Sequence, residues 1–539
     1  MYYKLRLMTF ICRGLGIAVI FCITGGCSPE HYKADADEEV YSIIDGKWQD
    51  DFGSKVNYRV SDVAASANDV QVEKAVPSSN VISLAEAVAM ATAHNRAYQT
   101  QKEALYLSAL SLTDERHKYA RQWFGTIDGS YISEGGEEET FVGGSDRGLV
   151  GFDHLQLLGD GVLVSTGLAI DWIRFLSGDP HTSLRSVLTA TVTAPILGSG
   201  AGKVAREQLT QAERNILYDI RSFNRYRKTF VVNIVNDYYN VLQLRDSVTN
   251  SENNYKRTVE SKERLEMEAE AGRKSRIDVD EAEQNVLTAE SRVVADRERY
   301  ELSLDAFKIS LSLPTDANVI LDQNELNALE EMGISEIEFT LDEAIETALL
   351  QRLDLHNSAD SIDDALRNVH LAAEGLGPQL NITGGANVSS REESDFSNFQ
   401  FNRGTYSLGF DADLPLDRKT QRNNYRRALI ELEQQQRQYD EDIDRIKLAI
   451  RGAYRRLKET ADRYKIEKNS LKLAEERVEM NKVLLDAGRV ETRILLLSQD
   501  ALLAAQNNVT GALIDHLDAK LSFYRDVGIL QVRPDGMWE

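Results

Sequence analysis

The stretch LRSVLTATVTAP, residues 184–195, decides the fold that the sequence predicts. Its apolar residues Leu188, Ala190, Val192 and Ala194 alternate with threonines. A period of two, with one apolar face and one polar face, predicts a β-strand that lies between an apolar and a watery environment.

The same pattern recurs in the second half of the chain, in TYSLGFDADLP (405–415). Two more stretches lie upstream, FGTIDGSYIS (124–133) and PQLNITGGANVS (378–389), so each half is predicted to hold a pair of strands. Strands of about ten residues with one apolar and one polar face are typical of an outer membrane β-barrel. Aromatic residues near the strand ends suit the girdles of such a barrel: Trp123, Phe124, Trp172, Phe175, Phe396, Phe399, Phe401 and Tyr406. Four strands leave open edges, which lipid does not tolerate, so the chain is predicted to oligomerise.

Long helices follow each pair of strands. No proline lies between Pro195 and Pro314 or between Pro415 and Pro534, and glycine is scarce in both windows. Since both residues disfavour helix interiors, each window predicts a helix of about 70 residues, a turn at a glycine and a helix of about 40. A coiled-coil seam runs along the first helix: Leu209, Ala212, Ile216, Ile220, Phe223, Phe230, Ile234, Tyr238 and Val241. The helices alone would suit a coiled-coil rod, and the strand pattern argues against it.

The two predicted turns repeat one another. EAGRKSRIDVDEAEQNVLTAES begins at Glu270, and DAGRVETRILLLSQDALLAAQN begins at Asp486. The halves also begin alike, because Ser83 and Thr340 each have a Glu three residues on, the pattern of a capping box at a helix start. The sequence therefore predicts a tandem repeat. The first half carries about 37 extra residues, mostly in the Gly-rich and acidic stretch 134–161, which predicts a loop or an added hairpin.

The N-terminus has the features of an export signal. Basic residues precede GLGIAVIFCIT, an apolar core of about ten residues that is too short to span a bilayer. The following TGGC resembles a lipobox, so residues 1–26 are predicted to be a lipoprotein signal peptide and Cys27 the lipidated residue. An ordinary signal peptide is the alternative. The three cysteines all precede residue 28, which excludes a fold stapled by disulfides: Cys12, Cys22 and Cys27.

The charge of the chain limits the classes of molecule that it is expected to bind. The formal net charge is −24, which argues against nucleic acid as a partner. Residues 27–80 are acidic and show no apolar pattern, so they are predicted to form an N-terminal tether.

Several stretches resemble the TolC-like outer membrane efflux protein family. LAEAVAMATAHN and LDEAIETALLQR stand at the repeat starts, and TAPILGSGAGK and LPLDRKTQRN stand where strand passes to helix. The two AGR turns and the closing stretches LDAFKISLSLP and LDAKLSFYRDVGIL complete the pattern. The resemblance covers about residues 81–530. It divides the chain into a first repeat, a linker, a second repeat and a C-terminal tail: 81–316, 317–337, 338–530 and 531–539.

This resemblance implies a mixed α+β membrane protein. Three copies would share a 12-stranded β-barrel, four strands from each protomer, continuous with a long α-helical coiled-coil barrel. The implied function is an outer membrane channel of a tripartite efflux or type I secretion system, anchored by its lipid and extending into the periplasm. The implied partners are a periplasmic adaptor, an inner-membrane RND or ABC transporter and outer membrane lipid. The alternative is a periplasmic coiled-coil scaffolding lipoprotein that forms no channel.

The resemblance also places the AGR turns at the periplasmic tip. Gly272 and Gly488 suit a turn that needs positive φ. Their neighbours are candidates for a gate or for adaptor contacts: Arg273, Lys274, Arg276, Asp278, Asp280, Arg489, Glu491, Arg493, Ile494 and Leu497. The run from Ile494 to Leu497 is apolar, which favours a gate that closes by dewetting, and leaves Asp278 and Asp280 as the acidic candidates. The alternative is a solvated tip.

Enzyme chemistry has no support in the sequence. The eight histidines are scattered, and neither HExxH nor GxSxG occurs. The GSGAG at 198–202 lacks the complete Gly-Lys-Ser/Thr ending of a phosphate loop. We therefore expect no catalytic residue, no metal and no cofactor.

Overall fold

The computed structural model describes these residues: 28–49, 52–53, 55–60, 80–127, 130–134, 138–143, 150–175, 182–198, 202, 204–334, 339–391, 395–414 and 416–533. The predicted signal peptide and Cys27 lie outside them. The chain divides into two units. The first takes in the described parts of Met1–Trp48, Tyr106–Leu217 and Gly377–Pro415, and the second takes in the remainder.

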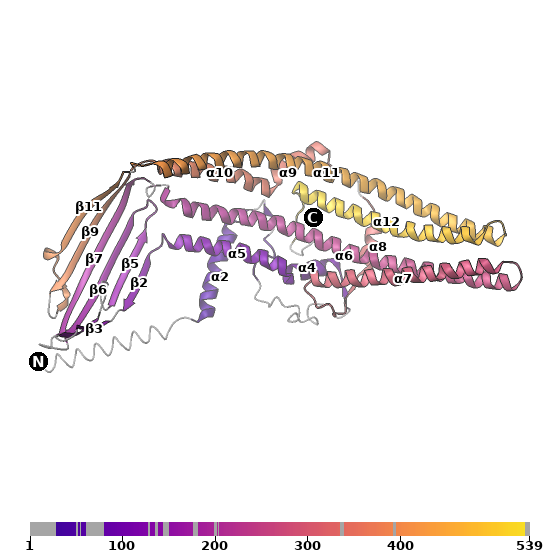
Figure 1. The fold of residues 1–539 in the computed structure, drawn as a ribbon, viewed down its shortest axis with the longest axis horizontal. Helices are drawn as coiled ribbons and strands as arrows, with labels where there is room; N and C mark the ends of the chain where they lie inside the picture. Colours follow the sequence, from indigo (N-terminus) through magenta and orange to yellow (C-terminus); the bar gives the residue numbers. More distant parts are fainter. Residues whose placement is uncertain are drawn as a thin grey trace. The chain divides into compact units, whose positions relative to one another are not determined.

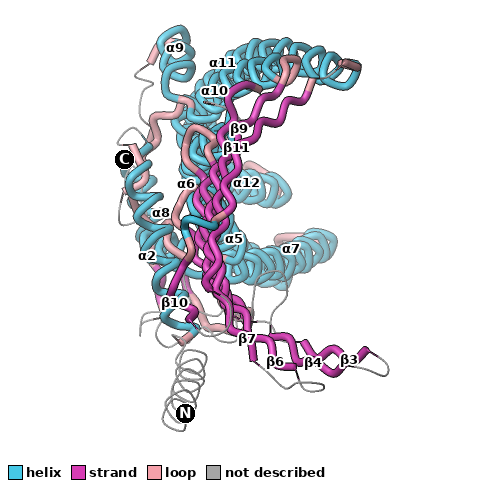
Figure 2. Tube along the Cα trace, turned by 90° about the vertical axis from the view of Figure 1, so that its left-hand side faces the viewer, coloured by secondary structure: helices cyan, strands magenta, loops and turns pink. Residues whose placement is uncertain are grey.

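An antiparallel sheet of nine strands dominates the first unit (Figures 1 and 2). The strands are β2 (Gln122–Ile127), β3 (Ser130–Glu134), β4 (Glu138–Gly143), β5 (Val150–Leu157), β6 (Leu163–Phe175), β7 (Thr182–Leu197), β9 (Gln379–Arg391), β10 (Asp395–Phe399) and β11 (Thr405–Asp413). They lie in six rows. The order is β10 and β11, β9, β7, β6, then β4 with β5, then β3 with β2. Strands of the two halves meet where β7 pairs with β9.

The alternation predicted in the strands is present in the sheet. Leu188 of β7 pairs with Val388 of β9, and Thr189 pairs with Asn387. Since directly paired residues of an antiparallel sheet lie on the same face, one face carries the apolar residues and the other the polar ones.

The predicted number of strands was wrong. The sequence predicted two strands in each half, whereas the first half contributes four of the six rows. β6 was missed because neighbouring apolar residues, as in Leu163-Val164 and Ala169-Ile170, obscure its period of two. The stretch at 134–161 contains β4 and β5, which lie in one row, and β5 forms a hairpin with β6. Of the two predicted forms the added hairpin is therefore present, and it extends beyond the stretch.

A helix, α2 (Pro29–Lys47), forms within the predicted tether. Its Val40 and Ile44 are buried, and the Tyr106 hydroxyl donates a hydrogen bond of 2.7 Å to Asp37 Oδ1. This segment therefore differs from the patternless tether predicted, because its few apolar residues recur at helical spacing among many acids.

The second unit is mostly helical. Its helices are α4 (Leu84–His94), α7 (Arg276–Ser310), α8 (Gln323–Met332), α9 (Leu341–Gln351), α10 (Leu353–Glu374), α11 (Lys419–Asp486) and α12 (Thr492–Val527), with parts of α5 (Arg96–His117) and α6 (Glu207–Glu270). A small parallel pair joins β1 (Val81–Ile82) and β8 (Ile320–Leu321). The long helices α6 and α11 have 64 and 68 residues and their partners α7 and α12 have 35 and 36, close to the predicted lengths.

The predicted helix starts and seam are confirmed. Ser83 and Thr340 each form a capping box with the Glu three residues on. Ile216, Phe223 and Tyr238 of the predicted seam are buried along α6. Among the described helices, none is both long and apolar enough to cross a membrane.

Candidate functional site

The two AGR turns close their helices in the same way. After α6, Arg273 N donates to Glu268 O at 2.8 Å, and Gly272 N donates to Ala269 O at 2.9 Å. After α11, Arg489 and Gly488 repeat both bonds at 2.9 Å, to Leu484 O and Leu485 O respectively. This is the Schellman motif, in which the glycine takes a left-handed conformation. Gly272 has φ 73° and Gly488 has φ 67°.

The helices that follow the turns begin differently. Ser275 caps α7 in a capping box with Asp278, whose Oδ2 accepts from Ser275 N at 3.1 Å and from Ser275 Oγ at 3.0 Å. Glu491 stands at the start of α12 and makes no side-chain cap bond. Asp278, a candidate acidic gate residue, therefore serves α7 locally in the single chain.

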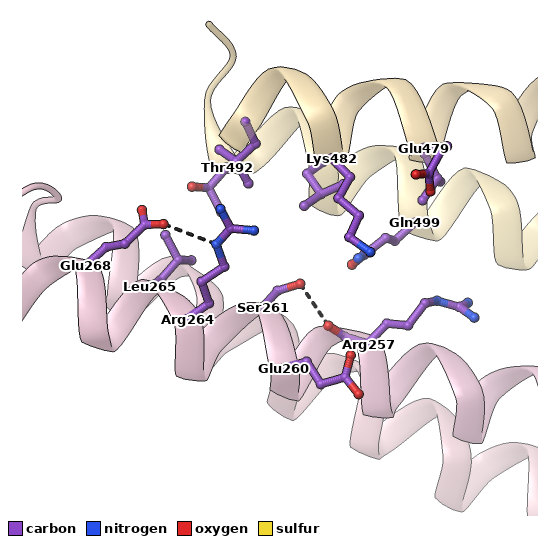
Figure 3. A pocket seen from close by; sticks show the side chains of 13 residues that line it. Arg257, Glu260, Ser261, Arg264, Leu265, Glu268, Glu479, Lys482, Thr492 and Gln499 are labelled. Carbon is purple, nitrogen blue, oxygen red and sulfur yellow. Dashed lines mark hydrogen bonds and ion pairs between the residues drawn. The ribbon is translucent and has the colours of Figure 1, made fainter. Parts of the chain in front are cut away.

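An ion pair joins the two repeats beside the tips. Arg264 of α6 binds Asp486, the last residue of α11. It also binds Glu268 of its own helix at 3.1 Å (Figure 3). The hydrogen bond to Asp486 raises the pKa of Arg264. Asp486, with which the second AGR turn begins, is thus bound by a residue of α6.

The apolar run at the second tip divides into two faces. Leu495 and Leu496 are each 5% exposed, whereas Ile494 is 41% exposed and Leu497 is 61% exposed. The pair Ile494 and Leu497, three residues apart on one face of α12, remains available to other molecules.

The other candidates lie at the surface of the tips. Arg273, Arg276, Asp280, Arg489, Glu491 and Arg493 are exposed, and Lys274 and Asp278 are half-buried. Arg276 and Asp280 form an exposed i,i+4 ion pair of 3.5 Å, which stabilises α7 only weakly. The structure therefore gathers the candidates in two tip groups and does not assign them a role.

A pocket of about 310 Å³ lies between α6, α11 and α12 beside the ion pair (Figure 3). Its lining residues are Arg257, Glu260, Ser261, Arg264, Leu265, Glu268, Val478, Glu479, Lys482, Leu485, Thr492, Leu495 and Gln499. Thr492 Oγ1 and Gln499 Oε1 are buried without a hydrogen-bond partner. Acidic and basic groups alternate in this lining. Within the described part of the chain no cluster of His, Cys, Asp or Glu could hold a metal.

Sequence reasoning missed Arg264 and the pocket. Asp486 carried a signal, because it occupies the acidic position of the repeated turn. Arg264 lies in the middle of a charged helix surface, where nothing in the sequence separates it from its neighbours.

The second tip belongs to a recognisable domain. Residues 344–528 match the family model of the outer membrane efflux protein. The chain carries an outer membrane efflux protein domain. The resemblance seen in the sequence is confirmed, and outer membrane efflux proteins are a channel family, not an enzyme family.

Solved structures share the fold of this chain over most of its length. CusC, described as forming a transmembrane channel, is 14% identical with a TM-score of 0.61, over 83% of this chain and 92% of CusC. The Campylobacter jejuni outer membrane channel CmeC is 15% identical with a TM-score of 0.60, over 83% of this chain and 85% of CmeC. The open state of the Neisseria gonorrhoeae outer membrane channel MtrE is 13% identical with a TM-score of 0.61, over 88% and 94%. None of the curated proteins compared with the chain matches it.

Proposed function

We propose that this protein is the outer membrane channel of a tripartite efflux or type I secretion system. Three copies form a β-barrel in the membrane and an α-helical barrel in the periplasm, and substrates pass through them without a chemical reaction. The efflux protein domain and the channel fold support this function. Cys27 carries the lipid anchor, and a periplasmic adaptor and an inner-membrane RND or ABC pump deliver the substrate.

The observation that carries the proposal is the two-faced sheet with open edges. β11 pairs only with β9 and β2 only with β5 within the described residues, so both outer rows offer free backbone groups. Leu408 and Phe410 of β11 are 84% and 79% exposed. An apolar face with open edges is stable in lipid only when further strands close the sheet.

Exposed apolar stripes on the helices support the assembly of several copies. On α11 they are Ile430, Leu448, Ile466, Leu473 and Met480, and on α7 they are Leu287, Val294, Leu302 and Ile309. Spacings of seven, eight and eighteen residues keep each stripe on one face of its helix. Apolar side chains that recur along one exposed helix face suit packing against another helix. We assign these stripes to contacts between the three copies.

At the tips we propose a closed gate. The Arg264–Asp486 ion pair holds the two repeats together, and Ile494 and Leu497 of three copies narrow the pore with apolar side chains. The exposed charges around Gly272 and Gly488 meet the adaptor.

Single-channel recording of the purified full-length protein in planar bilayers tests this function. We expect discrete conductance steps with a low open probability. A folded, trimeric protein that gives no conductance in any variant would contradict the channel and favour the periplasmic scaffold.

A further inference from the structure

Two further rows continue the sheet beyond β6, of which the sequence predicted β2 and not β5. β5 pairs with β6 over eight residues, from Val150↔Ile170 to Leu157↔Leu163. β2 in turn pairs with β5 over six residues, from Gln122↔Leu155 to Ile127↔Val150. In Figure 1 these strands lie side by side with β7, β9 and β11. The added hairpin is therefore built into the sheet and does not leave β6 as an edge.

The apolar face of the sheet continues over the rows of β5 and β2. The register places Leu188 of β7 beside Leu168 of β6, and Leu168 beside Phe152 of β5. Phe152 therefore lies on the same face as Phe410 of β11. On this face, Trp123 of β2 packs against His154 with ring centroids 4.5 Å apart, and Trp123 is 73% exposed. An exposed tryptophan near a strand end suits the interface of a membrane with water.

The polar face continues in the same way. Thr189 of β7 lies beside Gly167 of β6, and Gly167 lies beside Asp153 of β5. Asp153 therefore shares its face with Asp411 of β11. A side-chain carbon at Gly167 would lie 2.5 Å from Asp153 Oδ1 and 2.8 Å from Thr189 Oγ1, so these two polar groups flank the glycine closely. Water on this side of the sheet would solvate them.

The direction of the edges allows a second copy to close the sheet. Each row is antiparallel to the next, and the rows number six, so β2 and β11 run in opposite directions. The β11 edge of one copy can therefore pair antiparallel with the β2 edge of a second copy. This arrangement repeats around an axis and closes without leaving a free edge.

We propose that each protomer contributes six strand rows to the membrane wall, and that β11 pairs with β2 of the neighbouring copy. The inference rests on the trimer proposed above, in which three sheets of six rows close a barrel of 18 rows in place of the 12 implied by the family resemblance. Because barrel diameter grows with strand number, this barrel is wider than a 12-stranded one. Six rows rather than four set the width of the membrane pore.

Disulfide cross-linking tests which strand meets β11. The chain has no cysteine after Cys27, so any disulfide between strands must come from the introduced cysteines. One set of double variants combines Leu408→Cys or Phe410→Cys with Trp123→Cys, Gly125→Cys or Ile127→Cys. The other set combines the same β11 variants with Thr166→Cys, Leu168→Cys or Ile170→Cys of β6. All these positions lie on the apolar face, where a bridge needs Cα atoms about 4.4–6.8 Å apart.

We expect covalent trimers from at least one β11–β2 pair and none from the β11–β6 pairs. Ser407→Cys with Gly125→Cys places the thiols on opposite faces and should give none. Covalent trimers from β11–β6 would overturn the proposal in favour of a 12-row wall. Trimeric, conducting protein with no cross-link in either set would overturn the edge pairing alone. Protein that is neither trimeric nor conducting would overturn the proposed function with it.

Single cysteines give a second readout that needs no cross-link. In vesicles, Asp153→Cys should react with a charged, membrane-impermeant thiol reagent and its conductance should fall. The neighbouring Phe152→Cys should be shielded by lipid and react at least about tenfold more slowly. Equal reaction of both would place β5 outside the wall and contradict the six-row barrel.

Discussion

Arg264 of α6 and Asp486 of α11 form an ion pair that links the first repeat to the second beside the tip turns. The two side chains are 38% and 50% exposed, so water screens the pair. Such pairs stabilise by about 0.2–1 kcal/mol each, which is small for the whole fold but enough to shift a gating equilibrium.

Replacing Arg264 with alanine is expected to raise the open probability about 1.4- to 5-fold, since each 1.4 kcal/mol corresponds to a factor of ten. Planar bilayer recordings measure this directly. Arg276→Ala is the matched control, because it removes the exposed pair with Asp280 within one helix. The double variant Arg264→Asp with Asp486→Arg should restore closure. An effect of Arg264→Ala no larger than that of the control would contradict the role of the pair.

Leu497→Ser should raise the open probability while leaving the unfolding free energy nearly unchanged. Its side chain is exposed in the single chain, and a hydroxyl there would wet an apolar constriction. The neighbouring Leu496→Ser is the contrast, because Leu496 is buried and its loss should cost about 2–5 kcal/mol of stability. Recordings and chemical denaturation separate the two effects. If Leu497→Ser leaves the open probability unchanged, the gate lies elsewhere.

Gly272→Ala and Gly488→Ala are expected to destabilise the tips by about 1–2 kcal/mol each, because a Cβ disfavours the left-handed backbone. No atom within 4 Å of the new Cβ adds to this cost. Amide hydrogen exchange at Arg273 and Arg489 should then accelerate. Gly452→Ala in the interior of α11 is the control, and should stabilise by about 0.5–1 kcal/mol. Equal behaviour of all three variants would argue against the strained turn.

Lys228 predicts a dependence of stability on alkaline pH. Burial lowers its pKa to about 8, and its Nζ donates to Gly528 O at 2.9 Å. Between about pH 8 and 10.4 the unfolded chain holds a proton that the folded chain has lost, so stability should rise with pH in this window. We expect a rise on the order of 1–3 kcal/mol, from about 1.36 kcal/mol per pKa unit. Denaturation at pH 8 and pH 10 measures it, and Lys228→Met should abolish the rise.

The backbone-driven features of the fold followed from the sequence. Gly272 and Gly488 predicted their turns, because only glycine adopts positive φ without a steric cost. Ser83 and Thr340 predicted helix starts, because their side chains form capping boxes. The absence of proline between Pro195 and Pro314 allowed the long helix–turn–helix to be predicted. Each of these signals is local.

The features that depend on tertiary contacts could not be predicted from the sequence. β5 and β6 are stabilised by pairing with neighbouring rows, so their own alternation is imperfect, as Leu155 on the polar face shows. The Arg264–Asp486 pair needs two helices to be brought together, and nothing in the sequence separates Arg264 from the other charged residues of its helix. α2 was not predicted, because its buried Val40 and Ile44 lie among many acidic residues.

The two tip turns are closed by backbone hydrogen bonds alone, and this leaves their side chains free to diverge. Either tip can therefore change its surface chemistry without losing its shape. The first tip now begins α7 with the Ser275–Asp278 cap, and the second begins α12 with Ile494 and Leu497 exposed. One backbone motif thus gives a single chain two tips of different surface chemistry.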